Sequence, residues 1–436
     1  MNDSAKKVGY WEVVAIGIGG MVGGGIFAVL GLAVQLAHGG TPVAFAIAGV
    51  VALLTTYSYA RLSVTYPSQG GTVTFLDRAF GAGLLAGSLN ILLWLSYMVM
   101  LSLYSYAFGS YGATFLPAAW QPIGKHVLIS LSIVGIAGLN LLSAKVIGRA
   151  ESWIVALKLI ILLLFVGVGI WRIQPGQLAP STWTAPLQLV AGGFIIFLAY
   201  EGFELIANTA QDTKNPRRTL PRAYYSAVLF VIALYILVAV VTVGNLPVDQ
   251  IVNAKDYALA AAAKPFMGQA GFTLIAVAAL LSTASAINAT LYGAARLSYI
   301  IAKDGELPEF LEREVWNEPV VGLLITTAVT LLIANLFDLS SISTMGSSGF
   351  LLIFTAVNIA NVRLARQTNS RAWLSVIAAI ACVSALAALL WQTAVDSPGK
   401  ILVLVIMVGL SVGIEAAYRK ATGRKLRLSP GEIKPQ

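Results

Sequence analysis

The sequence has few charged residues, one cysteine and two histidines. Only 11% of its 436 residues are Asp, Glu, Lys or Arg, whereas soluble domains contain about 25%. A chain so poor in charge cannot cover a globular surface with polar groups, which excludes an ordinary soluble domain. The single cysteine, Cys382, cannot form an intrachain disulfide, so cysteine usage does not indicate a redox compartment.

The residues that most enzymes use are also scarce. The two histidines, His38 and His126, lie near the ends of expected helices, and no group of His, Cys, Asp and Glu has the spacing of metal ligands. No Gly-x-Ser-x-Gly nucleophile motif occurs. We therefore predict that the protein is not an enzyme, and that it has no catalytic residues, no metal site and no cofactor.

Apolar runs dominate the sequence, which is 58% hydrophobic with a mean hydropathy of +0.82. Runs of about 20 apolar residues are long enough to cross the hydrocarbon core, and they must be helical because lipid offers no hydrogen bonds. We therefore predict an all-α polytopic membrane protein in a lipid bilayer. Its twelve expected spans are residues 11–37, 41–65, 82–116, 125–144, 150–171, 187–210, 219–243, 270–302, 319–337, 341–362, 372–392 and 401–418.

The positions of the 28 lysines and arginines predict the orientation of these spans. If residues 1–10 lie in the cytoplasm, nearly all basic residues fall on the cytoplasmic side, which is the positive-inside bias. The exceptions are Lys125, Arg172, Lys255, Lys264 and Lys400 outside, and Lys158 within a span. We therefore predict a multi-pass protein of the cell membrane with a cytoplasmic N-terminal segment and a cytoplasmic tail at 419–436. This distribution also accounts for the net charge of +9, so no basic face remains for a nucleic acid.

Weak points in two spans suggest an internal repeat. Six glycines between Gly17 and Gly25 disfavour a continuous first helix, because each glycine costs about 1 kcal/mol relative to alanine. Five spans later, Phe197 to Glu204 contains two carboxylates, which are expensive within a membrane. A five-plus-five inverted repeat whose first helices are broken is the sequence pattern of one class of secondary transporter. The predicted repeats are residues 11–171 and 187–362, and 372–418 supplies two further helices.

The glycines of the first span also fit close packing of unbroken helices. Gly19 with Gly23, and Gly20 with Gly24, match the small-xxx-small pattern of such contacts. A nucleotide-binding loop would need a preceding strand and a following Gly-Lys-Ser/Thr, and neither is present. The number of glycines favours an unwound segment.

An unwound first span leaves backbone groups free to bind a ligand. Amide groups near Gly24 can hold a carboxylate at the positive end of the outer half-helix, and carbonyl groups near Gly19 can hold an ammonium or a metal cation. The sixth span offers the same groups in reverse polarity. We predict a site for a small zwitterion formed by Met21, Gly23, Gly24, Gly25, Phe197, Leu198, Tyr200 and Glu201.

Lys158 stands alone among apolar residues about two turns into the fifth span. Its side chain can snorkel to the cytoplasmic interface, or it can turn into the bundle, where burial favours the neutral amine and allows it to gain and lose a proton. The second interpretation makes the proton a coupling ion. It predicts oxygen partners for the amine at the Gly19 carbonyl, Ser282 and Ser285, although small serines in a long helix are also common packing residues.

Glu201 and Glu204 lie three residues apart in the sixth span. When protonated, each can donate a hydrogen bond to a neighbouring helix; when charged, each can select substrate side chains or sense pH. We favour Glu204 as the residue that ties helices together or senses pH, and Glu201 as the group that faces the cavity.

Across nearly its whole length the sequence resembles the amino acid–polyamine–organocation (APC) transporters, and the archaeal proton-coupled members most of all. The general likeness rests on Gly23–Phe27, Tyr200–Glu204, Asn215–Ala223 and Ala302–Pro308. The archaeal likeness rests on Val146–Glu151 leading into Lys158, and on Ala260–Phe266.

This resemblance implies a LeuT-like fold with twelve transmembrane helices, of which the first and sixth are discontinuous. It also implies alternating access by a rocking bundle, broad amino acid specificity, and the Lys158 amine in the place where sodium-coupled relatives bind Na⁺. The sequence departs from the family at Gly24, where a hydroxyl is common, and at Glu201, where many relatives have an apolar residue. A sodium-coupled symporter, an exchanger and a membrane sensor that binds without transport remain alternatives, and the oligomeric state stays open.

Overall fold

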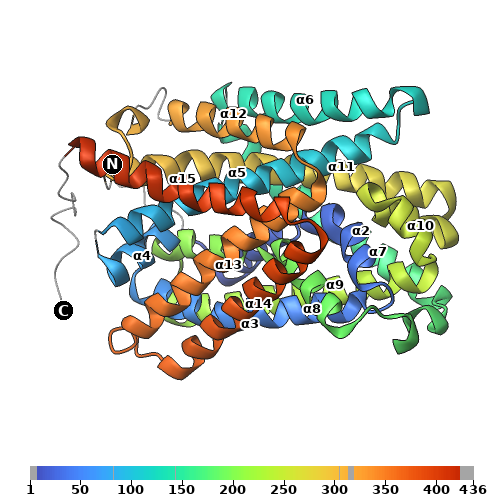
Figure 1. The fold of residues 1–436 in the computed structure, drawn as a ribbon, viewed down its shortest axis with the longest axis horizontal. Coiled ribbons are helices and arrows are strands. Elements are labelled where there is room, and N and C mark those ends of the chain that lie inside the picture. Colours follow the sequence, from blue (N-terminus) through green and yellow to red (C-terminus); the bar gives the residue numbers. More distant parts are fainter. Residues whose placement is uncertain (1–6, 82, 143, 304, 313–318, 423–436) are drawn as a thin grey trace.

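The computed structural model describes residues 7–81, 83–142, 144–303, 305–312 and 319–422. The tail predicted at 419–436 lies mostly outside these residues, as do the first six residues of the predicted N-terminal segment. Within the described ranges the chain forms fifteen α-helices and no strand (Figure 1). The helices are α1 (Tyr10–Met21), α2 (Gly25–Ala37), α3 (Thr41–Thr65), α4 (Thr72–Phe80), α5 (Leu84–Ala113), α6 (Gln121–Leu142), α7 (Ala144–Gly169), α8 (Pro186–Ile195), α9 (Pro216–Asn245), α10 (Val248–Asn253), α11 (Ala258–Lys303), α12 (Val320–Leu336), α13 (Leu339–Arg363), α14 (Ala372–Asp396) and α15 (Gly399–Thr422).

Eleven of the twelve predicted spans coincide with segments long and apolar enough to cross a bilayer, and the remaining one coincides with the shorter helix α12. Among the described residues, nine segments are long and apolar enough to cross a bilayer as single spans. Two further spans are bent pairs, α1 with α2 and α8 with the 3₁₀ segments that follow it, and the shorter apolar helix α12 completes the set. The predicted boundaries needed correction mainly at α7, which begins at Ala144 instead of residue 150, and at α11, which begins at Ala258 instead of residue 270.

The long helices run side by side in the view of Figure 1, with α4 at one end of the bundle and α10 at the other. We call these ends the α4 side and the α10 side. Helices α5 and α13 are mostly buried, whereas only about a quarter of the residues of α6, α14 and α15 are buried. Because a helix exposed to lipid remains apolar on its outer face, burial and not hydropathy separates the inner helices from the outer ones.

The first span breaks where the sequence predicts. Helix α1 ends at Met21, slightly later than the expected Gly19, and α2 begins at Gly25 with a bend of 46° between them. Glycine is also required for close approach, because a Cβ on Gly20 would lie 2.8 Å from the carbonyl oxygen of Gly202. The unwound segment and the close packing, which were alternatives at the sequence level, therefore occur together.

The sixth span breaks differently from a simple pair of half-helices. Helix α8 ends at Ile195, and two 3₁₀ segments follow, η5 (Phe197–Tyr200) and η6 (Phe203–Asp212). Gly202 lies between them with a φ of 113°, a left-handed conformation that only glycine adopts at low cost. The tighter winding of a 3₁₀ helix changes the direction of each side chain relative to the predicted α-helix.

Two short helices, α4 and α10, lie in the connections after α3 and α9, and the second closes the α10 side of the bundle. After α10, the 3₁₀ segment η7 (Lys255–Tyr257) packs against α2 at Gly31, where a Cβ would collide with the Lys255 backbone. Helix α11 begins soon after, at Ala258, and is kinked at Gly268, where φ is 64°. The span expected at 270–302 is thus the longer part of this kinked helix.

Candidate substrate and ion site

A cavity of about 700 Å³ lies beside the break in the first span. It extends from Tyr104 to the first turn of α1, where the Trp11 side chain is 77% exposed. In contrast, every residue of α2 from Gly25 to Val34 is buried. The cavity is therefore open along α1 and closed along α2. Its lining residues are Val8, Trp11, Glu12, Ala15, Ile16, Gly19, Gly20, Tyr104, Val155, Glu201, Gly202, Leu205, Ser285, Ala286, Ala289 and Thr290, and we call it the central cavity.

The Lys158 side chain turns into the bundle. Only 2% of the residue is exposed, and its Nζ donates a hydrogen bond to the carbonyl oxygen of Gly19 at 3.2 Å. Val155, almost one turn earlier on α7, lines the central cavity and packs against Gly19. The amine thus lies inside the bundle at the end of α1, where the helix leaves carbonyl groups without an intrahelical partner.

The two serines predicted as partners of this amine lie on α11 in different surroundings. The Ser282 hydroxyl donates to the carbonyl oxygen of Val22 at 3.2 Å and also contacts that of Gly23. Ser285 is half-buried and lines the central cavity. Ser282 therefore satisfies the carbonyl groups of the break itself, whereas Ser285 faces the space that a substrate can enter.

Most of the predicted substrate contacts are covered in this conformation. Among the predicted substrate-binding residues, Glu201 lines the central cavity, whereas Met21, Gly23, Gly24, Gly25, Phe197, Leu198 and Tyr200 are buried and absent from its wall. The Tyr104 ring packs on Gly24, so close that a Cβ there would overlap it. The expected carboxylate contact at Gly24 is therefore not accessible here, because an aromatic ring lies between it and the cavity.

Tyrosine and serine hydroxyl groups hydrogen-bond to several backbone carbonyl groups at the two helix breaks. The Tyr235 hydroxyl lies 2.7 Å from the carbonyl oxygen of Met21 and 3.2 Å from that of Ala199, and so joins both broken spans. Ser343 and Ser347 on α13 both donate to the carbonyl oxygen of Ile195. The sequence did not predict these residues, since a tyrosine or serine inside an apolar span carries no local signal of its partner.

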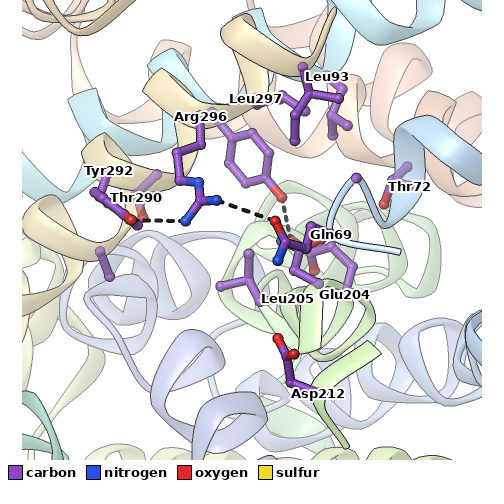
Figure 2. Close-up of a pocket in the computed structure, with 16 residues that line it drawn as sticks. Gln69, Thr72, Leu93, Glu204, Leu205, Asp212, Thr290, Tyr292, Arg296 and Leu297 are labelled. Carbon is purple, nitrogen blue, oxygen red and sulfur yellow. Dashed lines mark hydrogen bonds between the residues drawn. The ribbon is translucent and has the colours of Figure 1, made fainter. Parts of the chain in front are cut away.

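Glu201 and Glu204 are both buried, at 3% and 2% exposure, and lie three residues apart in the broken sixth span. Glu204 accepts hydrogen bonds from the Tyr97 hydroxyl at 3.2 Å and from the Gly202 amide at 2.8 Å. It therefore links η6 to α5, whereas Glu201 faces the central cavity. Figure 2 shows Glu204 in the wall of a second, smaller cavity.

This architecture defines a class of protein. Two broken helices meet beside a central cavity that is open to one side and closed to the other, and this arrangement is typical of one class of multi-pass membrane transporter. Comparison of the sequence with family models gives the particular family: the chain belongs to the amino acid permeases, whose model matches residues 8–413.

Individual relatives agree with this assignment. The chain is 36% identical to an uncharacterized protein of Methanocaldococcus jannaschii, over 96% of this chain and 97% of that protein. It is 35% identical to the inner membrane transport protein YbaT of Escherichia coli, over 85% and 86% of the two chains. The branched-chain amino acid permease BcaP of Bacillus subtilis is 24% identical, over 83% and 81%.

Proposed function

We propose that this protein is a secondary active transporter that carries amino acids of several kinds together with protons, by alternating access. The family description and the name of BcaP support an amino acid substrate. We further propose that it resides in the cell membrane with both chain ends in the cytoplasm. Since α15 ends at the same end of the bundle as α4 (Figure 1), the α4 side is then cytoplasmic. The present conformation is then open to the cytoplasm, because the central cavity reaches the first turn of α1.

The contact between Lys158 Nζ and the Gly19 carbonyl oxygen carries the proposal of proton coupling. A protonated amine donates three hydrogen bonds and brings a positive charge to the carbonyl end of α1. A metal cation would bind the same kind of oxygen. In this mechanism the charged amine holds α1 against α7, and loss of its proton weakens the contact between the two helices.

The central cavity suits amino acids of different sizes. Its volume of about 700 Å³ lies within the range of about 300–1,000 Å³ found for small-molecule sites, and its wall combines apolar side chains with a few polar groups. Gly19 and Gly20 lie in this wall, where the absence of a Cβ lets a ligand approach the backbone closely. Glu201 provides a carboxyl group for the ammonium or the side chain of the substrate.

Reconstituted vesicles test this function. We expect wild-type protein to accumulate labelled amino acids when the outside is acidified, without sodium. We expect Lys158→Ala to abolish the response to the pH gradient but to retain exchange of labelled for unlabelled substrate. Lys264→Ala is the matched control, because this lysine lies over the Phe272 ring at a distance from the cavity.

Different results would identify the alternatives. Uptake that needs sodium and ignores pH would identify a sodium-coupled symporter, and flux that needs amino acid on both sides would identify an exchanger. Binding without any flux would identify a sensor. A Lys158→Ala variant that still responds to the pH gradient would contradict the proposed role of the lysine.

A further inference from the structure

We infer that the second cavity is a further binding site for the transported amino acid, used between the central cavity and the α4 side, and that it suits zwitterions with an apolar side chain. This inference rests on the proposed transport function and adds a second substrate site to it. It follows from two charged side chains of opposite sign, which face this small cavity without forming an ion pair with each other.

The second cavity has the size and the position of a site for one small molecule. Its volume of about 290 Å³ is close to the lower end of the range of about 300–1,000 Å³ found for small-molecule sites. It lies between η6, the turn before α4, and α11 (Figure 2). Leu205, Ala289 and Thr290 belong to its wall and to the wall of the central cavity, so the two cavities are adjacent. A substrate can therefore leave the central cavity past the second one.

The Arg296 side chain of α11 is held in place across this cavity. Its guanidinium donates to the Tyr292 hydroxyl at 2.9 Å and to Gln69 at 3.4 Å, and it lies 5.6 Å from the centre of the Tyr292 ring (Figure 2). A guanidinium has five N–H donors, so these bonds fix its position and leave further donors for a ligand. Because its planar fork matches a carboxylate, Arg296 provides a site for the carboxylate of an amino acid.

Asp212, the last residue of η6, brings the opposite charge to the same cavity. Its backbone carbonyl oxygen accepts a hydrogen bond from the Val8 amide at 2.7 Å, which ties the end of η6 to the segment before α1. Its side chain is exposed and has no hydrogen-bond or ion-pair partner among the residues that the structure describes. The carboxylate of Asp212 is thus available to an ammonium group.

The two charges are separated, and the remaining acid of the wall is already used by the fold. In the view of Figure 2, Arg296 and Asp212 lie apart, with Leu205 between them. Glu204 accepts hydrogen bonds from the Tyr97 hydroxyl and the Gly202 amide. A ligand with both a positive and a negative group can therefore bind Arg296 and Asp212 at the same time, as a zwitterion does.

Apolar side chains complete the wall and indicate which amino acids fit. An α-amino acid presents a carboxylate, an ammonium and a side chain, and the third of these needs its own surroundings. Arg296 is the only cation among the residues that line this cavity, and Glu204 is engaged, so no free charge remains for a charged side chain. The apolar lining residues are Leu93, Leu205, Ala289, Leu297 and Ile300. The site therefore favours amino acids such as leucine.

Equilibrium binding of tritiated leucine to the purified full-length protein tests the second site. We expect two sites per chain in the wild type. We expect Arg296→Gln to weaken one of them about tenfold or more, because it removes a charged hydrogen-bond donor, and to leave the other unchanged. Arg172→Gln is the matched control, since this arginine of η2 (Ile170–Arg172) is exposed and lies outside both cavity walls.

Two analogues of leucine separate recognition by these residues from a structural role. The analogue 4-methylpentanoate lacks the ammonium group, and 3-methylbutylamine lacks the carboxylate. At the second site we expect Arg296→Gln to weaken both leucine and 4-methylpentanoate, but Asp212→Asn to weaken leucine and leave 4-methylpentanoate unchanged. We expect 3-methylbutylamine to be insensitive to Arg296→Gln. A general distortion of the cavity would affect all three ligands alike.

Transport measured from each side of the membrane gives a second readout. In vesicles of known orientation, we expect Arg296→Gln to raise the KM for leucine on the α4 side about tenfold and to leave the KM on the α10 side unchanged. Arg296→Lys keeps the charge but not the planar fork, so we expect an intermediate KM. Asp212→Asn remains informative if Arg296→Gln does not fold.

The outcomes distinguish this inference from the proposed function. Wild-type protein that neither binds nor transports any amino acid would contradict both. Transport that is intact while the wild type binds a single leucine per chain would overturn the second site alone. Two leucine sites that Arg296→Gln and Asp212→Asn both leave unchanged would likewise overturn it, because the second leucine would then bind elsewhere.

Discussion

The Nζ of Lys125 on α6 lies 2.7 Å from a carboxylate oxygen of Asp256 on η7. The same lysine lies 3.7 Å from the centre of the Tyr106 ring on α5. Since η7 also packs on α2 at Gly31, this ion pair connects the segment that closes the α10 side to the helices α5 and α6. We interpret it as a latch that favours the closed α10 side.

Breaking this latch should make the α10 side more accessible. A partly buried ion pair contributes about 1 kcal/mol, so we expect Asp256→Asn to increase the population open on the α10 side about fivefold. The rate at which an impermeant thiol reagent modifies a cysteine introduced at Phe27 measures this population. The double charge reversal Lys125→Asp with Asp256→Lys should restore the wild-type rate. A modification rate unchanged by Asp256→Asn would show that packing alone, without the ion pair, keeps η7 in place.

Replacing Gly20 by alanine should destabilise the protein, because the new Cβ would lie 2.8 Å from the Gly202 carbonyl oxygen, where the two broken spans approach backbone to backbone. Overpacking of this kind costs about 1–3 kcal/mol. The melting temperature of the purified protein is the measurement, and we expect it to fall by several degrees. Gly135→Ala in α6 is the matched control, since nothing lies within 4 Å of its added Cβ. Equal melting temperatures for the two variants would disprove close approach at Gly20.

Asp338 should stabilise the protein above about pH 4 and lose this effect in acid. Burial raises the pKa of its carboxyl group, but hydrogen bonds from Ser341 and the charge of Lys400 outweigh burial and lower the pKa below its usual value. A carboxyl group whose pKa is lowered by folding stabilises the fold above its unfolded pKa, which is about 3.9, and stops doing so as pH falls through its folded value.

Asp338→Asn isolates this effect. Asparagine retains the helix cap that Asp338 provides for the Ser341 amide at 2.9 Å, but it removes the charge. We expect the variant to melt at a lower temperature than the wild type at pH 7, and the difference to shrink as the pH falls below about 4. Parallel melting curves across this pH range would refute the prediction.

The sequence predicted most of the fold because local properties determine it. The length of each apolar run predicted the spans, and the glycines near Gly20 predicted the first break. The two carboxylates at Glu201 and Glu204 marked the second break, although the sequence did not reveal that the chain there winds as a 3₁₀ helix. The roles proposed for Lys158 and for the two acids remain predictions that transport measurements must test.

The surroundings of the candidate site were harder to predict. The sequence did not show that the Tyr104 ring covers Gly24, or that the Tyr235 hydroxyl bonds to carbonyl groups of both broken spans. Such contacts join residues far apart in the chain, and their partners depend on how the helices are rotated. One residue turns an α-helix by about 100°, so a span boundary known to a few residues does not determine which side chains face a cavity.

The sequence by itself determined that the chain crosses the membrane many times and that its first and sixth spans are interrupted, because hydrophobic length and glycine content act locally. Only the tertiary structure decided that the amine of Lys158 meets the end of α1, and that Glu201 and Glu204 line different cavities. The physical reason is that the environment of a polar group inside a bundle is created by neighbouring helices, whose positions follow from the packing of the whole chain.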